Sequence, residues 1–203
     1  MSKIINLKEE LDYNNAIRDS VDVLRKGELL VYPTDTIYGI GSDIYSESSL
    51  KKIASLKERA TIQPYIILIS SFDMLYELAI IEDKHLEIAK QYWPGPLTII
   101  FRSKIKVSRY IDNGNGKIAI RMPDNKFCLD LISAYGYPIT STSANIHTKQ
   151  QGKLVDIYNE FKDKIKLFIF DEEVQSFLPS TIIDCTDVEV KLVREGAVKT
   201  SFQ

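Results

Sequence analysis

The feature that most constrains the fold is an alternation of short apolar runs with segments of helical periodicity. Leu29 to Tyr32 is an apolar run ended by Pro33, and Asn14 to Lys26 carries apolar residues at helical spacing with Gly27 as a stop. The alternation continues along the chain, which is typical of α/β proteins. A hairpin near residues 182–192 closes the pattern and predicts a mixed rather than a purely parallel sheet.

The remaining elements follow from the same patterns. We expect further helices over residues 48–57, 72–79, 84–92, 126–135 and 154–161. We expect further strands over residues 66–69, 97–101, 118–121, 139–140 and 167–170. Residues 109–116 are rich in Asn and Gly and indicate a loop.

Length and composition favour one domain over residues 1–203, long enough to bury a core without disulfides. The chain has 28 acidic and 26 basic residues, so no overall positive field indicates nucleic-acid binding. This does not exclude a local basic cleft. Two cysteines, without a CxxC motif or a Cys/His cluster, argue against a zinc site and a disulfide framework, and favour a reducing compartment.

The chain shows no targeting or membrane signal. The segment Met1 to Leu11 lacks the continuous apolar stretch of a signal peptide. No apolar run approaches the roughly 20 residues that a membrane helix needs. We therefore expect a cytoplasmic protein without a membrane partner.

Two polar clusters follow predicted strands. Residues 34–36 (Thr-Asp-Thr) come after the Leu29–Tyr32 strand, and residues 141–145 (Ser-Thr-Ser-Ala-Asn) come after Ile139 and Thr140. Ligands of open α/β sheets bind beyond the carboxyl ends of strands. Hydroxyl and amide groups there can bind a carboxylate, a ribose or phosphates. The same residue types also cap helices and form turns, so both interpretations stay open.

Four cations stand at the ends of predicted elements. Lys57 and Arg59 point the same way if the chain is extended there. Lys57 also lies seven residues after Leu50, which predicts an inward side chain. Arg121 and Arg194 follow strands, where a guanidinium needs a carboxylate partner or an anionic ligand. Each cation alone fits a structural role; together they favour an anion site.

The sequence offers no evident nucleophile or catalytic base. It contains no GxSxG, HExxH or P-loop motif. His85 lies on a weak helix and is expected at the surface, and His147 is expected to border the site. Cys128 and Cys185 lie in apolar segments and are expected to be buried. We predict no protein metal site.

Seven segments, in order along residues 23–196, carry a resemblance to a known family. They are Pro33 to Gly41 (PTDTIYGIG), Lys57-x-Arg59, Trp93 to Thr98 (WPGPLT), Ala119 to Pro123 (AIRMP), Ser141 to Asn145 (STSAN), Ser180 to Asp184 (STIID) and Arg194 to Gly196 (REG). Together they resemble the YrdC/TsaC family of threonylcarbamoyl-AMP synthases, in its short, single-domain form. The resemblance implies an α/β fold with a twisted open mixed sheet flanked by helices and a concave ligand cleft.

The resemblance also implies a reaction, in which L-threonine, bicarbonate and ATP give threonylcarbamoyl-AMP and pyrophosphate. Magnesium is expected with the ATP. Other proteins, a downstream threonylcarbamoyl-transferase complex, then modify the tRNA adenosine beside the anticodon. Direct contact with tRNA stays open.

Site residues follow from the resemblance, motif by motif. Threonine is expected near Thr36, Arg121, Ser141 and Ser180 or Thr181. ATP is expected near Lys57, Arg59, Ser143, Asn145 and Arg194, with Lys57 and Arg59 catalytic. Lys117, at a position where the family often has a hydroxyl, adds a phosphate contact or is a strand-start lysine.

The sequence departs from the family pattern at three places. Ala60 stands where proline often follows the Lys-x-Arg pair, and Tyr65 stands where leucine is usual. Residues 146–148 (Ile-His-Thr) replace the usual Ser-Gly ending after Asn145. The last departure bears on the nucleotide contacts of that loop and not on the reaction.

Three other functions compete with this one. A double-stranded RNA-binding module would use the same cations, although acidic residues outnumber basic ones. A carbamoyl-transfer module of a larger maturation protein would carry zinc-binding cysteine arrays. A nucleotide-binding regulatory relative would bind ATP without turnover.

Overall fold

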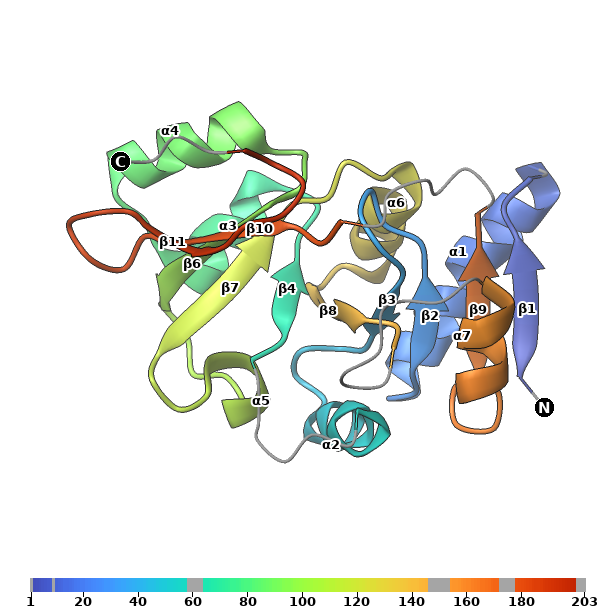
Figure 1. Ribbon diagram of the computed structural model, residues 1–203. Coiled ribbons are helices and arrows are strands. Elements are labelled where there is room, and N and C mark those ends of the chain that lie inside the picture. The colour runs from blue at the N-terminus through green and yellow to red at the C-terminus, as the bar shows by residue number, and fades with distance from the viewer. Residues whose placement is uncertain (1, 9, 58–63, 146–153, 172–177, 200–203) are drawn as a thin grey trace.

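The computed structural model describes residues 2–8, 10–57, 64–145, 154–171 and 178–199, and its strands and helices alternate along the chain (Figure 1). The helices are α1 (Glu10–Arg25), α2 (Glu47–Leu56), α3 (Phe72–Leu78), α4 (Asp83–Tyr92), α5 (Arg109–Asp112), α6 (Lys126–Tyr135) and α7 (Leu154–Phe161). The strands are β1 (Lys3–Asn6), β2 (Leu30–Tyr32), β3 (Gly39–Gly41), β4 (Ile66–Leu68), β5 (Ala79–Ile80), β6 (Leu97–Ser103), β7 (Lys117–Arg121), β8 (Ile139–Ser143), β9 (Leu167–Phe170), β10 (Thr181–Asp184) and β11 (Lys191–Arg194).

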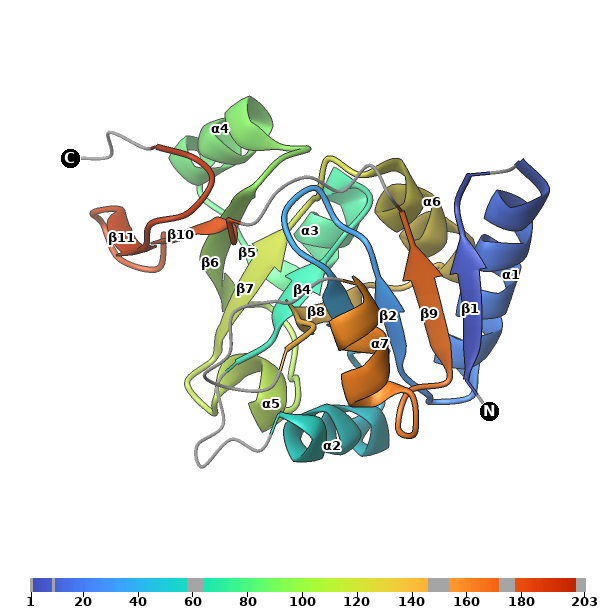
Figure 2. The same cartoon turned by 45° about the vertical axis from the view of Figure 1, so that its right-hand side comes forward.

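The strands form one open, twisted sheet in the order β1-β9-β2-β3-β8-β4-β7-β6-β10-β11, with β5 beside β6 (Figures 1 and 2). The sheet is mixed, because β2 pairs parallel with β9 and antiparallel with β3. β10 and β11 pair antiparallel, which confirms the predicted closing hairpin. The predicted α/β fold with an open mixed sheet is therefore confirmed.

Alternation along β2 divides the core between the two faces of the sheet. Leu30 and Tyr32 pack in the cluster that α1 and α6 cover, whereas Val31 packs in the cluster that α2 and α7 cover. Figure 2 shows the same arrangement, with α7 in front of β2 and β9 and α1 behind them. Because successive strand side chains point to opposite faces, a run that is buried throughout needs helices on both sides.

Local capping sets the ends of the helices that flank the candidate site. The Ser46 hydroxyl accepts from the Ser49 N–H at the start of α2, and Asn125 accepts from the Cys128 N–H at the start of α6. α6 ends at Gly136, whose φ of 83° is left-handed and suits glycine. These side chains satisfy N–H groups that a helix start leaves without partners.

Several short elements differ from the prediction, including the strands β1 and β5, which were not predicted. Residues 109–116, expected as a loop, begin with the four-residue helix α5, which ends at the left-handed Asn113. The strand β3 was not predicted, because two of its three residues are glycines. A Cβ on Gly41 would lie 2.5 Å from the Tyr32 ring, and one on Gly39 would lie 2.7 Å from the Ser141 hydroxyl. Close packing therefore requires glycine in a segment that sequence propensity marks as non-strand.

The polar run after Ile139 lies in the sheet, where we expected a loop after a two-residue strand. β8 extends to Ser143 and pairs with β4 through residues 139–141 and with β3 through residues 142 and 143. Pairing on both sides satisfies the backbone, so serine and threonine are tolerated in a central strand.

The burial predictions have mixed outcomes. Cys128, Cys185 and Lys57 are buried, as predicted. The prediction of a surface His85 is wrong, because α4 turns this side chain inward and leaves the residue 2% exposed. Burial lowers the pKa of His85, as expected for a cationic form that loses hydration.

Candidate active site

Arg121 ends β7 and is almost fully buried, with 4% of the residue exposed. Its Nε donates to the Gly95 carbonyl at 3.0 Å, and its Nη1 donates to the Thr36 hydroxyl at 2.8 Å. Its Nη2 forms an ion pair with Oδ1 of Asp35. A buried guanidinium is costly unless it is paired. We call Arg121, Asp35, Thr36 and Gly95 the Arg121 corner.

The loop after β2 fixes the direction of the hydroxyl hydrogen bonds in this corner. Thr34 donates its one hydroxyl proton to the Ile37 carbonyl at 2.7 Å. Its oxygen accepts from the main-chain N–H of Thr36 at 3.1 Å. The 3.0 Å contact between the two threonine hydroxyls is therefore donated by Thr36. Since Thr36 also accepts from Arg121, its hydroxyl has only acceptor capacity left for a ligand.

A second arginine, Arg194 at the end of β11, lies close enough to Arg121 for the two positive charges to interact. Its Nε and Nη2 donate to the Ser180 carbonyl at 3.1 Å and 2.7 Å, and Nη2 also reaches the Ser180 hydroxyl at 3.2 Å. Partial desolvation and, second, the positive charge of Arg121 lower the pKa of Arg194. Among the described contacts of Arg121 and Arg194 there is one carboxylate, that of Asp35. The two guanidinium groups therefore leave a net positive charge, which attracts an anion.

The other hydroxyls predicted near threonine are in different surroundings. The Ser180 hydroxyl shares a 2.8 Å hydrogen bond with Thr98. Thr181 is fully buried and donates to the Val198 carbonyl at 2.6 Å, so its side chain anchors the chain after β11. Ser141 lies on β8 against Gly39, three residues beyond Thr36. Thus Thr36 accepts from Arg121 and Ser180 accepts from Arg194, whereas Thr181 is engaged with the main chain.

Lys57 caps the C-terminal end of α2 and is fully buried. Its Nζ donates to the Ser143 carbonyl at 2.7 Å, to Oδ1 of Asn145 at 3.0 Å and to the Asn145 carbonyl. The Ser143 hydroxyl in turn donates to Oδ1 of Asn145 at 2.5 Å. These contacts bring together three predicted ATP-binding residues, which we call the Lys57 corner.

Of the other predicted ATP-binding residues, Lys117 lies outside these corners, whereas Arg59 is not among the described residues. Arg59 falls in residues 58–63 and His147 in residues 146–153, both outside the described residues. Lys117 begins β7, at the opposite end of the strand from Arg121, and its Nζ lies 3.0 Å from Oδ2 of Asp184. Although burial opposes it, hydrogen bonds from Thr186 and the ion pair with Lys117 lower the pKa of Asp184.

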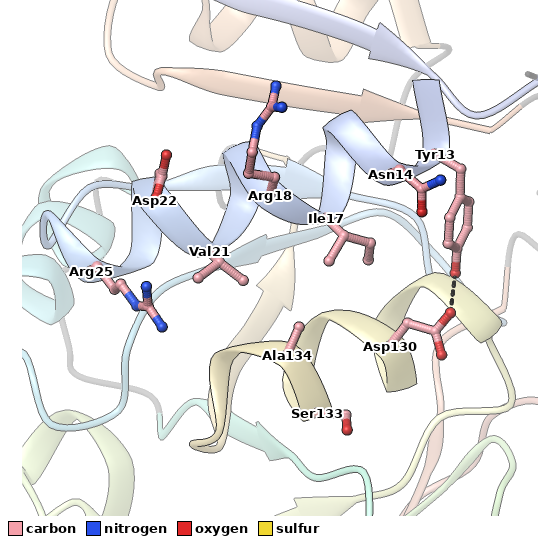
Figure 3. Close-up of a pocket in the computed structure, with 10 residues that line it drawn as sticks. All are labelled: Tyr13, Asn14, Ile17, Arg18, Val21, Asp22, Arg25, Asp130, Ser133 and Ala134. Atoms are coloured by element: carbon pink, nitrogen blue, oxygen red, sulfur yellow. Dashed lines mark hydrogen bonds between the residues drawn. The ribbon is translucent and has the colours of Figure 1, made fainter. Parts of the chain in front are cut away.

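A surface groove of about 540 Å³ lies elsewhere, between α1 and α6 (Figure 3). Across one end of it, the Tyr13 hydroxyl donates to Oδ2 of Asp130 at 2.7 Å. Arg18 and Arg25 line it from α1, and Ser133 from α6. Its lining contains none of the residues predicted to bind threonine or ATP. The concave ligand cleft implied by the resemblance therefore stays a prediction.

Sequence reasoning left some residues of the Arg121 corner unassigned. Asp35 lies in the segment Pro33 to Gly41 but was given no role, and Gly95 contributes a carbonyl that no side-chain pattern reveals. The available signal was the buried Arg121, which required a carboxylate. Within its own motif, Asp35 is the only acidic residue.

Comparison with known proteins gives a consistent result. The sequence model of the Sua5/YciO/YrdC family, described as telomere recombination, matches residues 22–196. Two relatives are called threonylcarbamoyl-AMP synthase. The one from Pyrococcus abyssi is 35% identical over 98% of this chain, and the one from Bacillus subtilis is 30% identical over 96%. The chain spans 58% and 57% of the lengths of these relatives.

Solved structures agree with the sequence comparison. The structure of P. abyssi Sua5 complexed with L-threonine has a TM-score of 0.90 and 35% identity, over 96% of this chain and 58% of that one. Escherichia coli YciO shares the fold at a TM-score of 0.90 and 23% identity, over the full length of both chains. Because the family model matches residues 22–196, which is most of the chain, the chain belongs to the Sua5/YciO/YrdC family.

Proposed function

We propose that this protein is an L-threonylcarbamoyladenylate synthase, an enzyme that transfers a nucleotidyl group. The proposed reaction converts L-threonine, bicarbonate and ATP to threonylcarbamoyl-AMP and pyrophosphate. Membership of the family and the names of the two relatives support it. The P. abyssi Sua5 complex with L-threonine supports an amino-acid substrate.

The chemistry of this reaction suits residues that attract anions. The attacking group is the oxygen of a carbamate, which is already anionic and needs no side-chain base. The enzyme must instead bring a carboxylate, a carbamate and a triphosphate together. Two unit charges at 4 Å repel by about 4 kcal/mol at an effective dielectric near 20. Lysine and arginine side chains that offset this repulsion catalyse by positioning and electrostatic stabilisation.

The Arg121 corner is proposed to hold the amino acid. Arg121 has three of its five N–H groups engaged by described residues, so two can serve a substrate carboxylate. Arg194, which is proposed to contact ATP, lies beside this site and donates to the Ser180 carbonyl. Ser141 stays a proposed contact, and Thr181 would act by holding the chain after β11.

The Lys57 corner is proposed to hold ATP, together with Arg59 and Arg194. The Lys57 ammonium has three donors, and oxygens of Ser143 and Asn145 accept from it. A phosphate contact by Lys57 therefore requires one of these oxygens to be exchanged for a phosphate oxygen. Lys117 remains a proposed ATP contact, and it would have to share its ammonium with Asp184.

Magnesium is proposed to enter with the ATP phosphates. The described residues contain no group of three or more His, Cys, Asp and Glu that would hold a metal ion. Mg²⁺ is commonly bound through substrate phosphates, waters and one or two carboxylates. The bound ion would neutralise part of the phosphate charge, while Lys57 positions ATP and Arg121 positions threonine.

The biological setting follows from the proposed reaction. Threonylcarbamoyl-AMP would pass to a downstream transferase complex that modifies tRNA. The chain is proposed to form one domain over residues 1–203 and to act in the cytoplasm. Within the described part of the chain, no helix has the length and apolar character required to cross a membrane.

The competing functions receive less support from the geometry. An RNA-binding face would need its cations exposed, but Lys57 is fully buried and Lys117 is paired with Asp184. No second function is therefore proposed.

The observation that carries the proposal is the placement of two buried cations, Arg121 and Lys57, among hydroxyl and carbonyl groups. The test incubates purified protein with ATP, magnesium, bicarbonate and L-threonine. Pyrophosphate release is measured, and the adenylate is identified by mass spectrometry. We expect product only when both threonine and bicarbonate are present. Pyrophosphate release that does not depend on both threonine and bicarbonate would contradict the proposal.

A further inference from the structure

Three tyrosines gather where the chain leaves α6 and where it enters α2. The rings of Tyr45 and Tyr137 meet edge to face, with their centroids 6.3 Å apart and an interplanar angle of 88°. Tyr135 packs against Tyr137 in the same manner, at 5.7 Å and 70°. We call Tyr45, Tyr135 and Tyr137 the tyrosine cluster. It shares no residue with the Arg121 corner or the Lys57 corner.

The two outer rings of the tyrosine cluster are open to solvent. Tyr45 is 54% exposed and Tyr137 is 57% exposed, whereas Tyr135 is 8% exposed and packs in the core beneath α1 and α6. A single exposed apolar side chain is ordinary on a protein surface, but adjoining ones mark contact sites. Because Tyr45 and Tyr137 touch each other and stay exposed, they indicate a surface for a partner.

The backbone holds the two outer rings in place. Asp43 and Ile139 form an isolated antiparallel bridge, and each lies two residues from an outer tyrosine. The carboxylate Oδ1 of Asp43 accepts from the main-chain N–H of Tyr45 at 2.8 Å. Tyr137 precedes a proline, which restricts its backbone. A ligand of this surface therefore meets rings whose positions are already fixed, so binding costs little ordering entropy.

The charge around the rings is negative. Burial and, second, the carboxylates of Asp43 and Glu77 raise the pKa of Tyr45. Burial and, second, Asp43 also raise the pKa of Tyr135, although the positive charge of Arg25 opposes this. Two carboxylates against one guanidinium leave a net negative charge. Such a charge repels the phosphates of nucleic acids, and both carboxylates and ring faces attract cations.

We propose that the tyrosine cluster is a docking site for an arginine side chain on the surface of a partner protein. A guanidinium is planar and weakly hydrated, so it stacks on an exposed tyrosine ring at little cost in hydration. Its N–H groups can at the same time donate to the carboxylates of Asp43 and Glu77. The inference does not rest on the proposed reaction, because it concerns a surface outside both corners.

The test is an NMR titration of the labelled full chain with the peptide acetyl-Gly-Arg-Gly-amide. A matched peptide carries citrulline in place of arginine, which keeps the shape and removes the charge. The arginine peptide should shift the signals of residues 43–45 and 135–137 saturably, and the citrulline peptide should bind about 5-fold more weakly. Tyr137→Ala should weaken the arginine peptide by about 5-fold, and Tyr137→Phe, which keeps the ring, should bind it as wild type does.

Two controls separate docking from other effects. Tyr76→Ala removes another exposed tyrosine, which lines a different groove, and should leave binding of the arginine peptide unchanged. Circular dichroism checks that each variant is folded. Tyr137→Ala should also keep the wild-type rate of pyrophosphate release, because Tyr137 belongs to neither corner.

The contrary outcomes are distinct. If no signal shifts saturably, or if the arginine and citrulline peptides bind equally, the surface does not recognise a guanidinium and the inference is wrong. If an oligoadenylate shifts the same signals and the arginine peptide does not, the rings stack on nucleic-acid bases, and the inference is also wrong. A folded Tyr137→Ala variant that loses pyrophosphate release would place the rings in the reaction and contradict a docking role.

Discussion

The Arg121 corner and the Lys57 corner both bury a cation, but they satisfy it in different ways. Arg121 is held by side chains, the Asp35 carboxylate and the Thr36 hydroxyl, together with one carbonyl from Gly95. Lys57 donates to the main-chain carbonyls of Ser143 and Asn145 and also to the side-chain Oδ1 of Asn145. Side-chain partners can be removed by substitution, whereas main-chain carbonyls cannot.

The two corners therefore call for different amino-acid substitutions as probes. In the Arg121 corner, each partner has a separable role, so single substitutions should change the affinity for one substrate. In the Lys57 corner, the two shortest described contacts of the lysine are to main-chain carbonyls, which substitution of Ser143 or Asn145 leaves in place. The corner should therefore respond to loss of Lys57 far more than to loss of a neighbouring side chain.

The largest expected effect is that of Lys57→Ala on turnover. Removing the ammonium should lower kcat by about 10²- to 10³-fold, because it removes charge stabilisation at the phosphates. Pyrophosphate release under saturating substrates measures this, and circular dichroism checks the fold. Lys52→Ala, an exposed lysine on the same helix, is the matched control and should retain the wild-type rate. A Lys57→Ala enzyme with an unchanged rate would remove Lys57 from the mechanism.

A smaller and more selective effect is expected for Arg121→Lys. An ammonium cannot reproduce the three separate directions in which the guanidinium donates. The KM for threonine should rise by about 10- to 100-fold, with the KM for ATP within about 3-fold of wild type. Steady-state kinetics with each substrate varied in turn provides the measurement. Arg102→Lys on the exposed end of β6 serves as control, and an equal rise in both KM values would contradict separate corners.

Ser143→Ala should have a modest effect. The Ser143 carbonyl, which accepts from Lys57, remains, and the hydroxyl's hydrogen bond with Asn145 is lost together with a longer 3.4 Å contact with Lys57. Loss of one hydrogen bond of about 1 kcal/mol predicts a rise of about 5-fold in the KM for ATP. Kinetics at saturating threonine tests this, with Ser55→Ala on α2 as control. A loss as large as that of Lys57→Ala would mean that the side chain, and not the carbonyl, organises the corner.

The smallest effect is expected at Lys117, outside both corners. Its partly exposed ion pair with Asp184 should contribute about 0–1 kcal/mol to stability. Thermal unfolding of Lys117→Ala, Asp184→Ala and the double variant measures the coupling between the two. If the coupling free energy is near zero and Lys117→Ala raises the KM for ATP, Lys117 binds the nucleotide and does not stabilise the fold.

The sequence predicted the parts of this architecture that depend on local pattern. The helix over residues 126–135 matches α6, and the inward Lys57 follows from its place on the stripe of Leu50. The need of Arg121 for a partner was also predictable, because a guanidinium ended an apolar strand.

The sequence could not predict contacts that depend on tertiary structure. Asp35 meets Arg121 only because the loop after β2 reaches the end of β7 across the sheet. The inward His85 and the short strand β3 were missed for a related reason: close packing overrides local propensity there. The polar strand β8 is explained by pairing on both sides, which its own residues do not reveal.

The central claim is that the Arg121 corner receives the amino acid and the Lys57 corner receives ATP. The most direct test is a pair of NMR titrations of ¹⁵N-labelled protein, one with L-threonine and one with ATP and magnesium. We predict that threonine shifts the amide signals of residues 34–37 and 95, whereas ATP shifts those of residues 143–145. Threonine-induced shifts concentrated at residues 143–145, with residues 34–37 unmoved, would contradict this assignment.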